Sequence, residues 1–587
     1  MIRPMNRRFL AVFACTLGFA GALTALSISV TSSSSAQNMP TSSDAPLLLF
    51  NAKIWTENPH QPEAQAVLIE ANRIIAVGSN DEIRNLAGPT VRAIDLQGKR
   101  VLPGFNDAHV HFLQGGDGLS SVQLGTANSP QEFRDRIAAF AKTQSKGTWI
   151  RNGEWDHERW TPASLPTHQL IDDVTPDNPV AVERLDGHMV LTNALAMKLA
   201  GVDKNTPDVP GGVIVRDAYG NPTGIFKDGA QDLIGKVIPD LTPAQARDGL
   251  LAAVKYAVEN GVTSVQEMSD TSTYDPAAAG IFRIYQRLLN DNLLTVRVAE
   301  ARPLGMWKTL ADVGISAHFG SPTLRLGSLK AFADGSIGSA TAWMYHPFLD
   351  QPNYAGLASE SLQHPDQMYA NIKGADQAGL QIQIHAIGDR AINAILNLYE
   401  RLEKEDAPNQ QKDRRLRIEH AQHIAQADMP RFGQLHVIAS MQPYHAIDDG
   451  RFVGKRLSPD VLKGSYAWRS VLDGGGVLAF GSDWPVAPMK PILGIYAAVT
   501  RRTLDGKNRN GWYPEQKLTV KEAVHAYTLA SAYAEGQEKI KGSIEPGKLA
   551  DLVVLSDDIF SIDPVEIEHT KVDMTLFNGL IVFDRTK

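Results

Sequence analysis

Residues 101–111 read VLPGFNDAHVH, an apolar run that ends in two histidines separated by one residue. Further short apolar runs follow along the chain, with amphipathic segments of helical periodicity between them. They are GVTSVQEM (261–268), TVRVAEAR (295–302), LRLGSLKAFADG (324–335), LQIQIHAIGD (380–389), RLRIEHAQ (415–422), HVIASMQP (436–443) and VLAFGSDWP (477–485). Alternating strands and helices are typical of a parallel sheet with right-handed crossovers, and eight such units close into a barrel. The sequence therefore predicts an α/β fold, a (β/α)8 TIM barrel over residues 103–540.

Both ends of the chain carry strands of a different kind. LLLFNAKIWT (47–56) and AQAVLIEANRIIAVG (64–78) alternate apolar and polar residues between Asn and Gly turns, and ADLVVLS (550–556) and DMTLFNGLIVF (573–583) repeat the pattern. Such alternation is typical of antiparallel strands. We therefore expect one small composite β-sandwich, built from residues 46–102 and residues 541–587.

The segment from about residue 114 to 240 is too long for one crossover connection, and it contains several Gly/Pro turns. We expect it to form an inserted lid or substrate subdomain above the barrel. Two later segments predict helices, residues 241–261 with Thr242 as the N-cap and residues 518–536 with Thr519 as the N-cap.

The first residues predict export. Basic residues precede a long apolar run (9–30), and the small residues Ser34-Ser35-Ala36 suit signal peptidase. We expect residues 1–36 to be a signal peptide cleaved near Ala36, and the mature chain to be periplasmic or secreted without a stable membrane partner. An uncleaved membrane anchor is the alternative, because the run is long enough to span a bilayer. The choice between Sec and twin-arginine export stays open.

Charge and cysteine content narrow the partners and cofactors. The 587 residues carry a formal net charge of -8 and no Lys/Arg run of the kind that binds phosphate backbones, so we expect no nucleic acid partner. The single cysteine, Cys15, lies in the predicted signal, which leaves the mature chain without thiolate ligands. Any metal is then held by imidazole, carboxylate or modified lysine, which favours Zn, Mn, Fe or Ni. A small-molecule substrate is the expected partner, and homo-oligomerisation stays open.

Polar residues follow the predicted barrel strands at their carboxyl ends, where an active site of this fold lies. The first strand ends in His109 and His111, which a period of two turns to the same side. The corresponding positions in the fourth, fifth, sixth and eighth runs are Lys330, His385, His420 and Asp483. Burying so many polar groups is costly unless ions or mutual pairing compensate them, and two divalent ions would do so. Each residue alone has a plainer explanation as a hydrogen-bonded core group.

Lys330 is the odd member of this set, because an ammonium group repels cations. Carboxylation by carbon dioxide would turn Lys330 into an anionic carbamate able to bridge two metals. Lys227 competes as the modified lysine, although it lies in a segment bounded by Gly and Pro rather than on a barrel strand.

The block PGFNDAHVH (103–111) resembles the opening signature of the amidohydrolase superfamily of metal-dependent hydrolases. The closer similarity is to its YtcJ-like branch, which includes N-substituted formamide deformylase. Supporting blocks are LDGHMVLTN (185–193), PTGIFKDGA (222–230), KAFADGSIGSATA (330–342), IHAIGDRAI (384–392), IEHAQ (418–422), GSDWPV (481–486) and GSIEPGKLADLVVL (542–555). The resemblance covers nearly everything from about residue 46 to the end, and its one local departure is Asn106, where many relatives have an aliphatic residue.

The resemblance implies a role for each strand-end residue. His109 and His111 would bind a first metal, His385 and His420 a second, and Lys330 would bridge the two as a carbamate. Asp483 would be both ligand and proton carrier. The implied cofactor is one or two divalent ions, with zinc expected, and the implied reaction is hydrolysis of a carbon–nitrogen bond in an amide, formamide or cyclic amide by activated water.

Two alternatives to this activity stay open. An esterase or lactonase would use the same metal site, and a periplasmic binding protein would keep the barrel without catalysis. In the insertion, His188 is a second catalytic candidate, because the Asp186-Gly187-His188 turn could aim its ring at the substrate carbonyl. Four further residues are candidates to line the pocket: Trp155, His157, Trp160 and Trp484.

Overall fold

In the computed structural model, the eight predicted strands form one parallel sheet. In sheet order they are β8 (Phe105–Val110), β14 (Val262–Glu267), β15 (Arg297–Pro303), β17 (Leu324–Phe332), β18 (Gln381–Ala386), β19 (Arg417–His420), β20 (Ile438–Met441) and β21 (Val477–Phe480). The segment after β21 returns to β8, where the Asp483 N–H donates to the His109 carbonyl at 2.7 Å and Trp484 bridges to Val110. The predicted TIM barrel is confirmed.

The structure describes residues 45–268, 278–406 and 413–587. The predicted signal peptide, residues 1–36, lies outside these ranges, so its export role stays a prediction. Within the described ranges, no helix combines the length and the apolar character that a membrane crossing requires.

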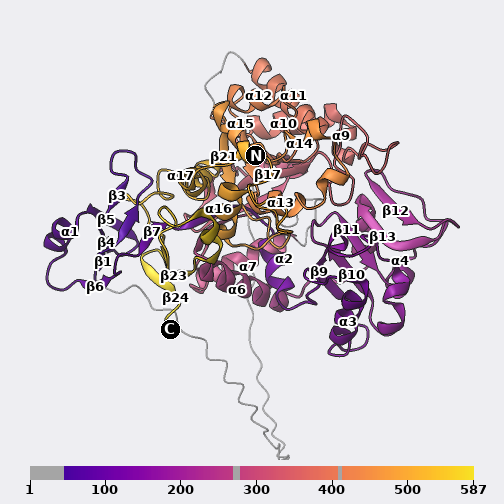
Figure 1. Cartoon of the computed structure of the whole chain (residues 1–587), viewed down its shortest axis with the longest axis horizontal. Coiled ribbons are helices and arrows are strands. Elements are labelled where there is room, and N and C mark those ends of the chain that lie inside the picture. The colour runs from indigo at the N-terminus through magenta and orange to yellow at the C-terminus, as the bar shows by residue number, and fades with distance from the viewer. Residues whose placement is uncertain (1–44, 269–277, 407–412) are drawn as a thin grey trace, which may run out of the picture. The chain divides into compact units, whose positions relative to one another are not determined.

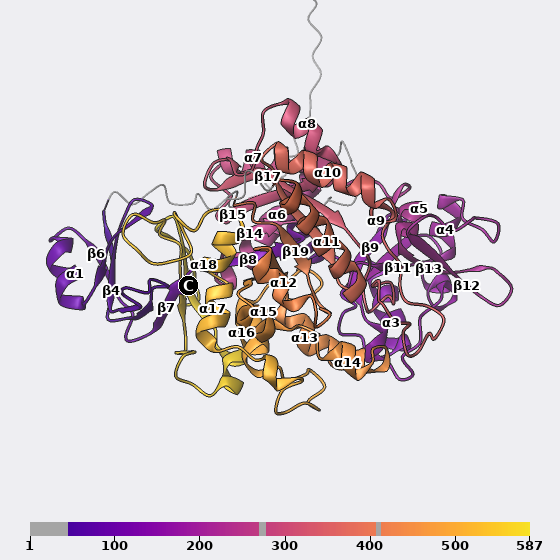
Figure 2. The same cartoon turned by 90° about the horizontal axis from the view of Figure 1, so that it is seen from above.

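Helices cover the outside of the barrel (Figure 2), among them α6 (Pro243–Glu259), α10 (Pro365–Gln377) and α11 (Asp389–Glu405). Strands covered in this way are buried on both faces, as β14 and β18 are along their whole length. The barrel interior also contains charge, because Arg417 is fully buried there. Its guanidinium donates to Glu419, to the Ala108 carbonyl at 2.8 Å and to Ser440 Oγ at 3.0 Å, so the buried cation is satisfied.

The two predicted N-caps are correct, but one predicted helix is broken. Thr242 and Thr519 each form a capping box with the residue three positions later. The segment after Thr519 divides into α17 (Val520–Ala526) and α18 (Leu529–Ala534). The break lies at Thr528, whose backbone leaves the helical region (φ -130°, ψ -92°) while its hydroxyl donates to the Val524 carbonyl at 2.7 Å.

The two ends of the chain assemble a pair of sheets, as the alternating patterns predict (Figure 1). One sheet is β5 (Arg73–Gly78), β4 (Ala66–Glu70), β1 (Leu47–Phe50) and β6 (Arg92–Asp95). The other is β24 (Leu580–Asp584), β23 (Val572–Phe577), β22 (Leu552–Leu555), β7 (Arg100–Pro103), β2 (Lys53–Trp55) and β3 (Glu63–Ala64). The antiparallel pair β7–β22 joins the two ends, and one apolar core contains residues from both, such as Val67 and Val554.

The long insertion forms a third β unit, which we call the lid. Its sheet has the order β12 (Gly212–Arg216), β13 (Pro222–Asp228), β11 (Met189–Thr192), β10 (Val180–Arg184) and β9 (Ile150–Trp155). Figure 1 shows these strands grouped with α3 (Pro130–Ala141) and α4 (Ala194–Ala200). The lid has apolar clusters of its own, around residues such as Phe133 and Phe226. It is therefore a folded subdomain rather than a loop.

Candidate metal centre

A cavity of about 810 Å³ lies at the carboxyl ends of the barrel strands. Lid residues such as Glu183, Asp186 and His188 form part of its wall. Five of the six predicted ligands line it: His111, Lys330, His385, His420 and Asp483. The sixth, His109, is fully buried directly beside Asp483. The structure thus places all six residues at the same end of the barrel. Their role as metal ligands stays a prediction.

His109 is oriented by a carboxylate in the barrel interior. Its Nδ1 donates to Glu419 Oε2 at 2.6 Å, which leaves the lone pair on Nε2. That Nε2 is buried, has no hydrogen-bond partner in the described part of the chain, and lies 3.4 Å from Asp483 Oδ1. A carboxylate behind a histidine whose other nitrogen is free is the usual support for a metal-ligating imidazole.

Asp483 Oδ1 is approached by two ring nitrogens at once. His111 Nε2 lies 3.2 Å away and His109 Nε2 lies 3.4 Å away, yet Oδ1 has no hydrogen bond of acceptable geometry among the described residues. The lone pair of His109 Nε2 and a carboxylate oxygen that face each other are costly when buried. The ligand atoms of His109, His420 and Asp483 lie within 4.8 Å of one another. This donor set fits a divalent cation with nitrogen and oxygen ligands.

Left-handed backbone conformations orient two of the predicted ligands, His420 and Asp483. Along β19, Arg417 and Glu419 share the interior face, so simple alternation would turn His420 outward. His420 instead has φ 71° and is followed by Ala421 at φ 43°, which turns the ring toward the mouth. Asp483 has φ 61°. Such conformations cost about 1–3 kcal/mol each in non-glycine residues and cluster at functional sites.

His385 and His420 are left with different unprotonated ring nitrogens. His420 Nδ1 donates to Gln442 Oε1 at 2.9 Å, which leaves Nε2 unprotonated. His385 Nε2 donates to the Gly335 carbonyl at 3.2 Å, which leaves Nδ1 unprotonated. Burial lowers the pKa of both imidazoles, so both are neutral and able to bind a cation. The two ring centroids are 4.5 Å apart.

Lys330 is 1% exposed on β17, and its Nζ lies 5.0 Å from the centre of the Phe332 ring. Within the described part of the chain, no carboxylate approaches this Nζ to 4.0 Å. Burial lowers the pKa of Lys330 to about 8, although Glu419 and Asp483 oppose the shift. The competing lysine, Lys227, is engaged elsewhere, because its Nζ donates to the Ser339 carbonyl at 2.8 Å.

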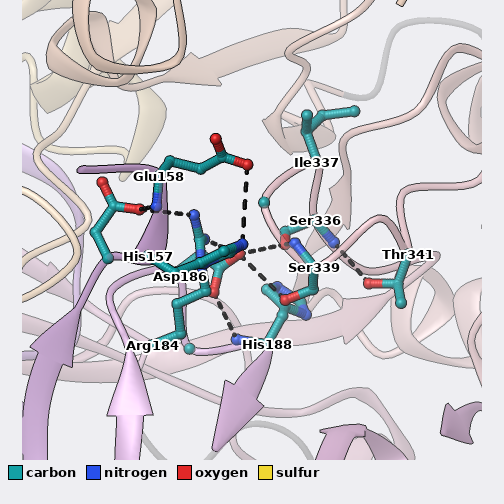
Figure 3. A network of polar contacts seen from close by, with 12 residues as sticks. His157, Glu158, Arg184, Asp186, His188, Ser336, Ile337, Ser339 and Thr341 are labelled. Atoms are coloured by element: carbon teal, nitrogen blue, oxygen red, sulfur yellow. Dashed lines mark hydrogen bonds and ion pairs between the residues drawn. The ribbon is translucent and has the colours of Figure 1, made fainter. Parts of the chain in front are cut away.

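An ion-pair network joins the lid to the loop after β17 (Figure 3). Asp186 accepts hydrogen bonds from Ser336 and Ser339 of that loop and pairs with Arg184 at 2.7 Å. Arg184, 2% exposed, also pairs with Asp156 at 3.2 Å. The network holds the 184–188 turn firmly at the cavity wall.

His188 lies at the cavity end of this network. Its Nδ1 donates to Asp228 Oδ1 at 2.7 Å, and its ring centroid is 5.1 Å from that of His385. Burial alone lowers the pKa of His188, but the hydrogen bond to Asp228 and the charges of Asp228, Asp186 and Asp334 together outweigh burial and raise the pKa overall. The structure therefore places His188 beside the predicted ligands as a hydrogen-bond donor with a second nitrogen to spare.

Sequence reasoning missed several supporting residues and left the place of four others open. Glu419 is detectable in hindsight from the RIEH alternation, while Gln442 and His445 follow β20 without a pattern that marks them. For the four further candidates, lining the pocket and packing in a core were equal alternatives, and the structure supports packing in a core. Trp155, His157 and Trp160 are buried in the lid, and Trp484 stacks on Tyr256 at 5.1 Å. These side chains pack in local cores rather than in the cavity wall, as is common for large aromatic rings.

Comparison with known proteins identifies what this geometry resembles. A model of the Amidohydrolase family matches residues 92–583. The chain is 38% identical over 527 residues to Protein LONG AFTER FAR-RED 3 of Arabidopsis thaliana, across 88% of this chain and 89% of that protein. It is 31% identical to Putative amidohydrolase YtcJ of Bacillus subtilis, across 91% and 98%. It is 27% identical to N-substituted formamide deformylase of Arthrobacter pascens, across 92% and 98%.

A solved structure extends the similarity. An uncharacterized metal-dependent hydrolase from Pyrococcus horikoshii OT3 superposes with a TM-score of 0.70 at 25% identity, over 89% of this chain and 99% of that one. The resemblance drawn from the sequence blocks is confirmed by these matches.

Proposed function

Because the chain belongs to the amidohydrolase family, we propose that it is an exported, metal-dependent hydrolase that cleaves the carbon–nitrogen bond of an amide, formamide or cyclic amide. The observation that carries this proposal is the convergence of His109 Nε2 and His111 Nε2 on Asp483 Oδ1, in which the buried, unprotonated Nε2 of His109 faces a carboxylate oxygen. The similarity to N-substituted formamide deformylase supports the type of bond. The apolar run and small residues before Gln37 support export.

We assign the ligands to two groups. His109, His111 and Asp483 would hold one ion, and the lone pairs of His385 Nδ1 and His420 Nε2 would be available to a second. Zinc is the expected ion. A divalent ion in such a site lowers the pKa of a bound water toward 7 and polarises a carbonyl.

Lys330, carboxylated to a carbamate, would be a ligand shared by the two groups. Burial in the barrel lowers its pKa to about 8, so the neutral amine is accessible near neutral pH. The neutral Nζ attacks carbon dioxide, a nitrogen–carbon bond forms and one proton is released. The resulting carbamate is an anion with two oxygens, which removes the repulsion between a lysine and the neighbouring cation.

Asp483 and His188 move and hold protons at the substrate. Asp483 accepts a proton from the attacking water and delivers it to the leaving nitrogen, because an amide anion is a poor leaving group. Protonated on both nitrogens, the form that its raised pKa favours, His188 donates a hydrogen bond from Nε2 to the substrate carbonyl, with Asp228 fixing the ring through Nδ1. The network of Figure 3 keeps His188 in place.

The proposal is tested with purified mature protein of measured metal content. A panel of N-formyl and N-acyl amines and cyclic amides is assayed beside esters that carry the same acyl groups. We expect turnover of at least one amide class, dependent on bound metal. Turnover of esters alone would refute the carbon–nitrogen specificity, and metal-loaded protein that turns over nothing would favour a binding role.

A further inference from the structure

α13 (Pro443–Asp449), which follows β20, contributes a histidine that the proposed chemistry has not used. His445 lines the cavity and is 9% exposed. Its Nε2 is buried and has no hydrogen-bond partner among the residues that the structure describes. That nitrogen lies 3.9 Å from Asp483 Oδ2. A buried polar atom without a partner, aimed at the proton carrier, requires a physical explanation.

The other ring nitrogen shows which proton His445 carries. The amide Nε2 of Gln422 faces His445 Nδ1 at 3.4 Å, and an amide nitrogen only donates. His445 Nδ1 is therefore the acceptor, and the neutral ring carries its proton on Nε2, toward Asp483. His420 has the reverse arrangement, because the oxygen of Gln442 receives its Nδ1 proton. His420 can bind a cation, whereas His445 is a donor.

The two oxygens of Asp483 face different groups. Oδ1 lies 3.2 Å and 3.4 Å from the free nitrogens of His111 and His109, which is the side of the proposed ion. Oδ2 lies 3.9 Å from both His420 Nδ1 and His445 Nε2. His420 Nδ1–H already donates a hydrogen bond to Gln442 Oε1. His445 is therefore the donor left to engage Oδ2.

We propose that His445 is a positioning residue for Asp483, and that its Nε2–H holds Oδ2 turned toward the cavity, where the leaving nitrogen takes up the proton. This inference rests on the proposed role of Asp483 as proton carrier. Hydrogen bonds at catalytic groups are commonly long without substrate and shorten in the complex. Without the donor, Asp483 is free to rotate, and a displacement of about 1 Å at a reacting group costs on the order of 100-fold in rate.

The test compares His445→Phe, His445→Asn and His445→Gln in the metal-loaded protein. Glutamine extends an amide N–H to about the reach of Nε2, whereas asparagine reaches only the position of Nδ1. We expect kcat for an amide to fall about 10- to 100-fold in the Phe and Asn variants and to be largely restored by Gln. An activated ester with the same acyl group should be affected little, because its leaving group needs no proton. Bound metal should match the wild type in all three variants.

His423→Phe is the matched control. His423 is also buried, its Nδ1 bonds to Ser465 Oγ at 2.7 Å and its Nε2 also has no partner among the described residues, but it does not line the cavity. We expect this variant to keep the wild-type ratio of amide to ester turnover.

Asp483→Asn separates failure of the inference from failure of the proposed function. If this variant lowers amide turnover selectively but His445→Phe lowers amide and ester equally, His445 has only a structural role. The same conclusion follows if Gln restores no more than Asn does. If Asp483→Asn itself keeps its metal and fails to discriminate between the substrates, the proton role of Asp483 is wrong and the inference falls with it.

Discussion

Replacing Glu419 with glutamine tests how the barrel interior supports the metal centre. Glu419 is fully buried and accepts hydrogen bonds from His109 Nδ1 at 2.6 Å and from Arg417 Nε at 2.8 Å. Burial alone raises its pKa, but Arg417, His109 and Lys330 together outweigh burial and lower the pKa to about 2, so the group is a carboxylate. Glutamine has one acceptor oxygen for these two donors. Either His109 or Arg417 must then face the amide nitrogen.

The size of the effect follows from these contacts. Loss of a carboxylate behind a ligating histidine typically costs 10- to 100-fold in metal affinity, which is about 1.4–2.8 kcal/mol. Breaking a buried ion pair from one side costs about 3–5 kcal/mol of stability. Because glutamine keeps one acceptor, we expect a loss of about 3 kcal/mol in the metal-free protein. Glu419→Gln should therefore weaken both metal binding and folding.

Competition with a chelator measures the metal affinity, and thermal unfolding of metal-free protein compares the stabilities. Asp551→Asn is the matched control, because Asp551 forms a buried pair with Arg297 at 2.6 and 2.8 Å, and Arg297 opens β15 at the other end of the barrel. It should lose similar stability and keep wild-type metal affinity. Wild-type metal affinity in Glu419→Gln would refute the claim that Glu419 orients a ligand.

Three further predictions concern the mouth of the barrel. Lys330→Ala should lose metal and activity, with partial rescue by short carboxylic acids, and an unmodified Lys330 in the mass of active protein would contradict the carbamate. Asp483→Asn should lower kcat for amides by about 10²–10⁴-fold, and less for activated esters, with metal content measured in the same sample. Arg184→Lys can keep only one of the ion pairs with Asp156 and Asp186, while Asp156 still pairs with Arg451 and Asp186 still accepts from Ser336 and Ser339, so it should cost about 1–3 kcal/mol of stability in thermal unfolding and raise KM. Unchanged values of both would show that the lid network is dispensable.

The fold was accessible from the sequence because its signals are local. Each barrel strand is a short apolar run, and the capping-box residues Thr242 and Thr519 mark where their helices begin. The break at Thr528 was not predicted, because the apolar pattern on both sides of it is continuous. In the structure, the Thr528 backbone is non-helical and its hydroxyl donates to the Val524 carbonyl. The arrangement of the lid strands was equally hidden, because strand order depends on contacts between distant segments.

The site could be predicted only in part, because part of its geometry also depends on contacts between distant segments. His109 and His111 follow from a period of two at a strand end, and the other predicted ligands from their place after apolar runs. The orientation of His420 depends on its left-handed backbone, which alternation does not predict. The tautomers are decided by Glu419, Gln442 and Gln422, and these meet the histidines only in the folded barrel.

The most direct test of the metal-dependent hydrolase is a titration of verified metal-free protein with zinc, with hydrolysis of an N-formyl amine followed at each addition. The convergence of His109, His111 and Asp483, with the unprotonated Nε2 of His109 facing the carboxylate, predicts no turnover at the start and a rate that rises in proportion to bound zinc until the site is full. Full turnover by the metal-free protein, or zinc binding that leaves the rate at zero for every amide that the protein binds, would contradict the account.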